Sequence, residues 1–312
     1  MLTVSVITPS FNQSLYLEQT ICSVLEQDYP ALEYFVIDGG STDASLEIIQ
    51  RYEHQLAGWV SERDRGQADA INKGFARATG DIVAWLNSDD VYQPGAIRAA
   101  VEAFRANPQV GLVYADVLSI DEHSRPFNLQ TFRQYTLTDL MAFRIISQPS
   151  VFLRRTVLEQ AGLLDLSYHY LLDHHLWLRV AQIAPLLYLP RTLAAARYHA
   201  QAKNLAHTRE FGREAFRIVA WMETDPRFAP LFAQHRRRIL AGAHRLDAFY
   251  LLDGGFYRHS LAAYARAFRY NPVAVLAEAH RVLYAFFAPL GLKRLRSLYN
   301  RLRSSVKDIS SF

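Results

Sequence analysis

The chain has 312 residues, with 34 Lys+Arg, 30 Asp+Glu, a net charge of +4 and a hydrophobic fraction of 50%. This composition is typical of a globular protein and excludes a disordered, collagen-like or low-complexity chain. A single cysteine, Cys22, excludes an internal disulfide and a zinc site with several thiolates. Low cysteine usage fits a reducing compartment such as the cytosol.

Charge is distributed unevenly along the chain. Residues 1–200 carry 15 Lys+Arg and 22 Asp+Glu, whereas residues 201–312 carry 19 and 8. This asymmetry predicts a functional site in the acidic front part and an anionic partner for the basic rear part. The longest uncharged apolar runs have 11 residues and contain proline. A membrane-spanning helix needs roughly 20 apolar residues, so none is predicted.

Short apolar runs alternate with helical patterns through the first 120 residues. The chain opens with alternating Leu2, Val4 and Val6, which indicates a strand rather than a signal peptide. Strands are predicted over 4–8, 34–38, 82–86 and 112–115, and helices over 17–25 and 46–52. Apolar strands alternating with helices predict a mostly parallel, Rossmann-like sheet buried on both faces by helices.

The pattern becomes weaker after residue 122. Residues 131–147 are predicted to form a loop and a helix, followed by a strand over 150–153, a helix over 173–183 and a strand over 186–189. From about residue 205 onward only helical spacing is found. We therefore predict an α/β domain over residues 1–205 and an all-helical, basic C-terminal region over 206–312.

Polar side chains follow three of the predicted strands, at the point where each strand ends. They are Thr8-Pro9-Ser10-Phe11-Asn12, Asp38-Gly39-Gly40-Ser41-Thr42-Asp43 and Asn87-Ser88-Asp89-Asp90. Ligands of open parallel sheets bind beyond the carboxyl ends of the strands, so these segments are predicted to face one site.

The acidic pair Asp89-Asp90 has two interpretations. Adjacent carboxylates repel, and a divalent cation such as Mg²⁺ or Mn²⁺ would relieve that repulsion. The segment Asn87–Asp90 also has the composition of an ordinary solvated turn. No Gly-x-Gly-x-x-Gly follows a strand and no Gly-x-x-x-x-Gly-Lys-Ser/Thr occurs. Dinucleotide-binding dehydrogenases and P-loop proteins are therefore disfavoured.

Four motifs in order resemble the family-two inverting glycosyltransferases of the GT-A fold. They are Ile7-Thr8-Pro9-Ser10-Phe11-Asn12, Ile37-Asp38-Gly39-Gly40-Ser41-Thr42-Asp43, the stretch from Asp64 to Gly74 (DRGQADAINKG), and Trp85-Leu86-Asn87-Ser88-Asp89-Asp90. The resemblance covers about residues 1–200. It implies a GT-A domain that binds a nucleotide-sugar donor.

The resemblance also implies roles for individual residues. Thr8, Pro9 and Asp38 would bind the nucleotide base, with the Arg65–Asn72 region beside them. Asp89 and Asp90 stand where the family has its metal and ribose carboxylates, with Asn87 where many members have an acid. Asp173, in Asp173-His174-His175, aligns with the catalytic base. Residues near the diphosphate would be Arg197 or His199, with Lys203; His199 is also a candidate metal ligand, and Gln148 would shape the acceptor side.

These roles imply a single displacement with inversion at the anomeric carbon. The donor would be a UDP-sugar, and the acceptor hydroxyl would belong to a glycan or a lipid-linked molecule in cell-surface polysaccharide assembly. Two alternatives remain. A sugar-phosphate nucleotidyltransferase should have a glycine- and basic-rich loop after the first strand, which this chain lacks, and a non-catalytic nucleotide-sugar binder is distinguished only by turnover.

The last 20 residues contain an amphipathic pattern with basic side chains. Leu295, Leu298, Tyr299 and Leu302 share one helical face, and arginine and lysine occupy much of the remainder. This pattern predicts a cytoplasmic enzyme that contacts the membrane surface peripherally. The alternatives are a helix packed on the catalytic domain with a solvated basic face, or a dimer contact. No nucleic-acid motif accompanies the charge, so no nucleic-acid partner is predicted.

Overall fold

The computed structural model describes residues 1–290 of the chain. These residues form two compact units. The first comprises residues 1–125, 130–136 and 146–197, and the second comprises 126–129, 137–145 and the chain from residue 198. The predicted domains, 1–205 and 206–312, stay a prediction. The boundary between the two compact units lies between residues 197 and 198, and the second unit also includes two internal segments.

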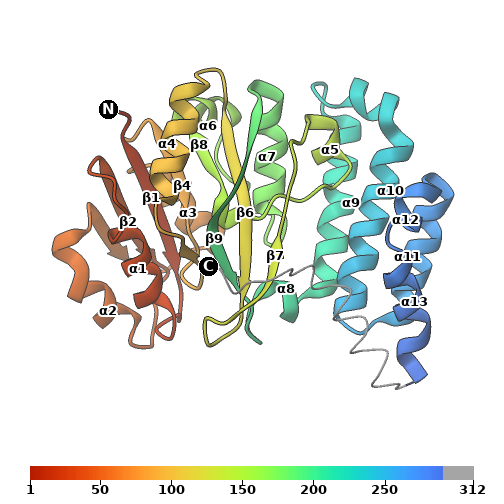
Figure 1. The fold of residues 1–312 in the computed structure, drawn as a ribbon, viewed down its shortest axis with the longest axis horizontal. Helices are drawn as coiled ribbons and strands as arrows, with labels where there is room; N and C mark the ends of the chain where they lie inside the picture. Colours follow the sequence, from red (N-terminus) through yellow and green to blue (C-terminus); the bar gives the residue numbers. More distant parts are fainter. Residues whose placement is uncertain (291–312) are drawn as a thin grey trace. The chain divides into compact units, whose positions relative to one another are not determined.

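The first unit is built on a sheet with the strand order β3-β2-β1-β4-β8-β6-β9-β5. Figure 1 shows β2, β1 and β4 side by side in this sheet. In that order the strands are β3 (Gly58–Ser61), β2 (Leu32–Asp38), β1 (Val4–Ser10), β4 (Ile82–Trp85), β8 (Phe152–Arg154), β6 (Leu112–Ile120), β9 (Leu186–Arg197) and β5 (Val91–Tyr92). Strands β3, β2, β1 and β4 run parallel, as do β6 and β9. Strand β8 is antiparallel to both β4 and β6, and β5 to β9. A further strand, β7 (Pro126–Gln130), follows β6 in the chain.

Helices cover both faces of this sheet. They are α1 (Leu17–Leu25), α2 (Ser45–Tyr52), α3 (Gln67–Phe75), α4 (Ala96–Ala106), α6 (Arg155–Ala161) and α7 (Leu172–Ile183), with 3-10 turns at Glu53–Gln55 and Gln148–Ser150. Every residue of β1 is buried. Val4 and Val6 belong to a cluster that includes α1, α2 and α4. On the other face, a Cβ added to Gly74 of α3 would lie 2.4 Å from Cγ2 of Ile7, so the missing side chain lets α3 approach β1 closely.

The second unit is helical apart from the start of β7. Its helices are α5 (Leu137–Met141), α8 (Lys203–Ala206), α9 (Thr208–Thr224), α10 (Ala229–Asp253), α11 (Tyr257–Tyr270), α12 (Pro272–Leu276) and α13 (Ala279–Phe287), with a 3-10 turn at Ala288–Leu290. Helix α10 packs against α9 and α11. It also binds the internal segment 137–145, because Arg245 donates to the Phe143 carbonyl (3.0 Å) and Arg238 pairs with Asp139 (2.5 Å).

The predicted fold class is confirmed: a mixed, mostly parallel sheet flanked by helices precedes a helical C-terminal region. Within residues 1–290, no helix is long and apolar enough to cross a membrane. The amphipathic pattern predicted around Leu295–Leu302 lies outside the described residues.

Candidate active site at the carboxyl edge of the sheet

Strands β1, β2, β3 and β4 end together at one edge of the sheet. Ser10 pairs in register with Asp38, and Asp38 pairs with Ser61, so three strands end side by side. Strand β4 continues this edge, because Trp85 pairs with Ile7 and Leu86 donates to the Ile7 carbonyl. The structure therefore brings the three predicted polar segments to the same edge.

Thr8 and Pro9, the predicted base-pocket residues, are buried at the end of β1. The Thr8 hydroxyl lies 2.9 Å from the hydroxyl of Tyr34, whose pKa is raised by burial. Ser10 is 3% exposed, and within residues 1–290 its hydroxyl has no hydrogen-bond partner.

Asp38 is fully buried and organises the turn that follows β2. Its Oδ2 accepts from the backbone N–H groups of Gly40 (3.0 Å) and Ser41 (2.9 Å) and from the Ser61 hydroxyl (2.7 Å). Its Oδ1 accepts from the Ser41 hydroxyl (2.5 Å). These bonds satisfy a carboxylate that would otherwise be costly to bury. The direct contact with the base that was predicted for Asp38 stays a prediction. Such a contact would require an Asp38 oxygen to accept from the base in addition to these protein donors.

The segment after β3 carries Asp64 and Arg65. The Asp64 carboxylate accepts from the Gly66 backbone N–H at 2.8 Å, a turn that Gly66 permits with a φ of 106°. The Arg65 guanidinium is largely exposed and pairs with Asp69 at 2.9 Å. Arg65 is therefore available to a ligand at the cost of one ion pair.

Asn72 uses both ends of its side-chain amide within the protein. It donates to the Leu164 carbonyl (2.9 Å) and accepts from the Leu164 backbone N–H (3.0 Å). Arg179 of α7 binds the carbonyls of residues 161–163 in the same segment. Asn72 therefore holds the segment that leads into α7, and its predicted contact with the donor stays a prediction.

The two carboxylates after β4 differ in their surroundings. Asp90 is buried, and its oxygens accept from the Arg197 backbone N–H (3.0 Å) and from the Asn87 amide (3.1 Å). Burial, and next to it the negative charge of Asp89, raise the pKa of Asp90 well above its ordinary value. Asp89 is half-buried. Of the two, Asp89 is the better placed to bind an external cation.

The donor set at this edge suits a hard divalent cation that also binds its substrate. Within the described part of the chain, no group of three or more His, Cys, Asp and Glu side chains converges on one point. Mg²⁺ commonly takes only one or two protein carboxylates and completes its coordination with water and substrate phosphates. Asp89, which is more exposed than the buried Asp90, fits that arrangement.

Arg197 ends β9 and is almost completely buried. Its guanidinium donates to the Asp89 carbonyl (2.9 Å), the Asp121 carbonyl (3.2 Å), the Ser124 hydroxyl (2.9 Å) and the Gln19 amide oxygen (2.8 Å). It also lies 4.6 Å from the ring centre of Tyr16. These contacts fix the backbone of the acidic turn, so the structure gives Arg197 a positioning role. Its predicted diphosphate contact stays a prediction.

Asp173 lies in the first turn of α7. Its Oδ1 accepts from the His174 backbone N–H at 2.7 Å, and the amino end of a helix stabilises a carboxylate. Trp177, one turn further on, stacks on Trp85 at 5.2 Å. Because Trp85 ends β4, this stack supports α7 beside the acidic turn. Gln148 also binds the end of β4, because its side-chain amide donates to the Trp85 carbonyl at 2.7 Å.

His174 and His175, which follow Asp173, and His199 and Lys203 complete the motif segments. His174 and His175 are buried in α7, and the His175 ring lies against Tyr168 at 4.4 Å. His199 and Lys203 belong to the second unit. The metal role of His199 therefore stays a prediction.

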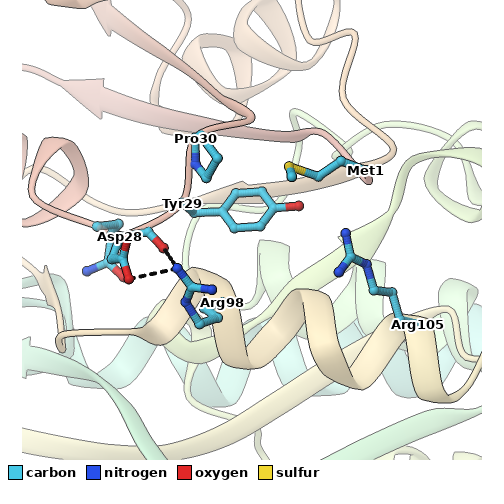
Figure 2. Close-up of a pocket in the computed structure, with 7 residues that line it drawn as sticks. Met1, Asp28, Tyr29, Pro30, Arg98 and Arg105 are labelled. Carbon is cyan, nitrogen blue, oxygen red and sulfur yellow. Dashed lines mark hydrogen bonds and ion pairs between the residues drawn. The ribbon is translucent and has the colours of Figure 1, made fainter.

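A pocket of about 550 Å³ opens at the opposite end of the strands, near the start of β1 (Figure 2). Arg98 of α4 binds both the carbonyl and the carboxylate of Asp28 there, each at 2.7 Å, and Arg105 lies further along the same helix. This pocket lies at the amino edge of the sheet and contains none of the predicted site residues.

Comparisons with known proteins agree with this arrangement. The family model described as Glycosyl transferase family 2 matches residues 5–161. An uncharacterized glycosyltransferase from Nostoc sp. is 37% identical over 36% of this chain and 35% of its own length. The putative teichuronic acid biosynthesis glycosyltransferase TuaG of Bacillus subtilis is 40% identical over 32% of this chain and 40% of TuaG. The chain thus matches well under half the length of these two relatives.

Solved structures share the fold at lower identity. TarS 1–349 from S. aureus, in complex with UDP-GlcNAc, has a TM-score of 0.65 at 18% identity, covering 99% of this chain and 94% of that chain. The mannosyltransferase PcManGT from Pyrobaculum calidifontis, in complex with GDP-Man and Mn²⁺, has a TM-score of 0.64 at 22% identity, with coverages of 96% and 83%.

The sheet order, the acidic turn after β4 and the family match together define a glycosyltransferase. The chain belongs to glycosyl transferase family 2, as its sequence motifs predicted.

Proposed function

We propose that this glycosyltransferase moves a sugar, with inversion, from a nucleoside-diphosphate donor to an acceptor hydroxyl in cell-surface polysaccharide assembly. The observation that supports the proposal is that β2 and β4, which lead into Asp38 and Asp89, end at the same sheet edge, and that α7 packs on the end of β4 through Trp177 and Trp85. The fold neighbours solved with UDP-GlcNAc and GDP-Man support a nucleotide-sugar donor, and TuaG supports a role in polymer assembly. We favour a UDP-sugar.

In this mechanism Asp173 takes the proton from the acceptor hydroxyl. The acceptor oxygen forms its bond to the anomeric carbon as the bond from that carbon to the diphosphate breaks. Asp89 would hold a Mg²⁺ or Mn²⁺ ion, which offsets negative charge on the departing diphosphate. Asp90 and Arg197 keep the backbone around Asp89 in place. No covalent sugar–protein intermediate forms, so the configuration inverts.

Replacing Asp173 by Asn tests the proposal. A general base contributes about 10²–10⁴ to the rate, so Asp173→Asn should lower kcat by that factor. Donor affinity should change little, because the base acts on the acceptor. Release of nucleoside diphosphate gives the rate, and calorimetric titration gives donor affinity. Asp28→Asn, at the amino edge, serves as the matched control. Near-normal turnover in Asp173→Asn would exclude the base assignment.

We also propose that the second unit contacts a membrane surface. Over residues 272–289 every exposed residue is apolar, including Val273, Leu276, Leu283 and Phe286, which are 57–74% exposed. The sequence that follows carries six Lys+Arg and one Asp in residues 291–312. Apolar side chains beside basic residues favour binding to anionic lipid headgroups. Such contact would bring the enzyme to a lipid-linked acceptor on the cytoplasmic face.

A further inference from the structure

Helix α1 carries polar side chains on a buried face. Thr20, Ser23 and Gln27 follow the spacing of one helical face; Thr20 is fully buried and Gln27 is 9% exposed. Ile21 and Val24 of the same helix belong to the apolar core. Buried hydroxyl and amide groups need hydrogen-bond partners, and the partners of this polar face lie far along the chain.

The first two side chains of this face bind backbone groups at and after the acidic turn. The Thr20 hydroxyl donates to the Asp90 carbonyl at 2.7 Å, across 70 residues of sequence. The Ser23 hydroxyl accepts from the Tyr92 backbone N–H at 3.2 Å and donates to the Thr20 carbonyl at 2.8 Å. Helix α1 therefore holds the end of the acidic turn and the start of β5.

Gln27 continues this contact towards α4. Its side-chain amide donates to the Gln93 carbonyl at 3.0 Å and accepts from the Ile97 backbone N–H at 3.3 Å. These bonds lie beyond β5, on the side away from the acidic turn. Gln27 therefore belongs to the same polar face as Thr20 but does not bind the acidic turn.

The peptide group between Asp89 and Asp90 is held at both ends. The Arg197 guanidinium donates to the Asp89 carbonyl at 2.9 Å, and the Asp90 backbone N–H donates to the Asn87 carbonyl at 3.1 Å. The Thr20 hydroxyl binds the next carbonyl, that of Asp90. Because peptide groups are planar, holding two in succession limits the orientations of the turn that carries the Asp89 carboxylate.

We propose that Thr20 is a positioning residue for the divalent cation and acts through the backbone of the acidic turn. Thr20 is buried and its hydroxyl is bound to the Asp90 carbonyl, so it does not itself serve as a ligand. Side chains that orient metal ligands typically contribute about 10- to 100-fold to metal affinity. This inference rests on the proposed function, in which Asp89 holds the cation.

Substitutions that remove or keep the Thr20 hydroxyl test the inference. Thr20→Val has nearly the same shape without the hydroxyl, and Thr20→Ser keeps the hydroxyl. Calorimetric titration with UDP or GDP, whichever binds the wild type more tightly, is repeated over a series of Mn²⁺ concentrations and in EDTA. The Mn²⁺ concentration that strengthens nucleotide binding half-maximally should rise about 10- to 100-fold in Thr20→Val and stay close to the wild type in Thr20→Ser. Nucleotide binding in EDTA should change little, because no cation is then held at Asp89.

Gln27→Met is the matched control, since it removes hydrogen bonds of the same buried face away from the acidic turn. It should lower the urea midpoint of unfolding at least as much as Thr20→Val and keep the wild-type Mn²⁺ dependence. A wild-type Mn²⁺ dependence in Thr20→Val would overturn the inference, and so would an equal loss in Thr20→Ser or Gln27→Met. If Thr20→Val does not fold, Thr20→Ala provides the same comparison.

The wild-type protein separates failure of this inference from failure of the proposed function. Nucleotide binding that does not depend on Mn²⁺ would overturn the positioning role of Thr20 and leave sugar transfer in place. A wild-type protein that binds no nucleoside diphosphate would instead contradict the proposed function.

Discussion

Arg197 provides a direct test of how the acidic turn is held. Its guanidinium reaches four acceptors, contributed by Asp89, Asp121, Ser124 and Gln19. Lysine keeps the positive charge but has a single nitrogen on a flexible stem, and it cannot reproduce a planar fork of donors. We expect Arg197→Lys to keep one or two of these four hydrogen bonds and to leave the remaining acceptors buried.

The expected cost follows from the number of hydrogen bonds lost. Two or three bonds at about 1–1.5 kcal/mol each correspond to about 3 kcal/mol of unfolding free energy. For a folded unit of about 200 residues, that free energy corresponds to a fall in Tm of about 6–12 °C. If Arg197 mainly contacts the donor diphosphate, the substitution should weaken donor binding and leave Tm almost unchanged.

Thermal unfolding by circular dichroism, combined with donor titration, distinguishes these outcomes. Arg125→Lys is the matched control, because Arg125 pairs with Asp121 in the same region while its side chain is 73% exposed. An exposed ion pair contributes about 0–1 kcal/mol, so this variant should melt close to the wild type. A Tm for Arg197→Lys within about 2 °C of the wild type would refute the positioning role.

Two further predictions concern pH and lipid. Burial raises the pKa of Asp43, but hydrogen bonds from Ser45 and Ser14 outweigh it and lower the pKa to about 2. Its stabilising contribution should therefore be complete above about pH 4, the unfolded pKa, and should be lost as pH falls towards 2. Asp43→Ala should cost about 1–2 kcal/mol in urea unfolding at pH 7, with a smaller difference from the wild type near pH 2; a constant difference would contradict this. On anionic vesicles, Leu283→Glu/Phe286→Glu should reduce sedimentation of the protein about tenfold or more, since each buried apolar side chain contributes about 1.5–3 kcal/mol. Leu163→Glu, an exposed leucine of the first unit, should sediment like the wild type; equal sedimentation of all three proteins would exclude α13 from lipid binding.

The sequence predicted the helices and strands whose hydrophobic pattern can be recognised from neighbouring residues alone. Strands β1, β2 and β4 and helices α1, α2 and α7 were all predicted, because each has a clear hydrophobic run or face. Strand β3 was missed. It has four residues, begins with Gly58, and is only partly buried. The sequence also gave no sign that β8 lies antiparallel between β4 and β6, since strand direction depends on pairing with distant residues.

The candidate site shows the same limit. Its residue types and strand-end positions could be predicted, but hydrogen-bond partners could not. Asp38 is bound by Ser61 of the missed strand, and Asn72 by Leu164, 92 residues further along. Asp64 appeared in the sequence only as part of a motif. Its carboxylate lies beside Gly39, a contact that depends on β2 and β3 being neighbours.

The segment 137–145 affects how this protein can be divided. It lies between parts of the first unit in sequence, yet its Asp139 and Phe143 bind arginines of α10, and Gly242 of α10 has room for no side chain beside the Ala142 carbonyl. Truncating the chain after residue 197 would remove α10, which the segment 137–145 contacts, and would expose the apolar side chains of that segment. The C-terminal helices therefore cannot be exchanged for another domain at a single junction after residue 197. Any replacement for these helices must also bind the segment 137–145.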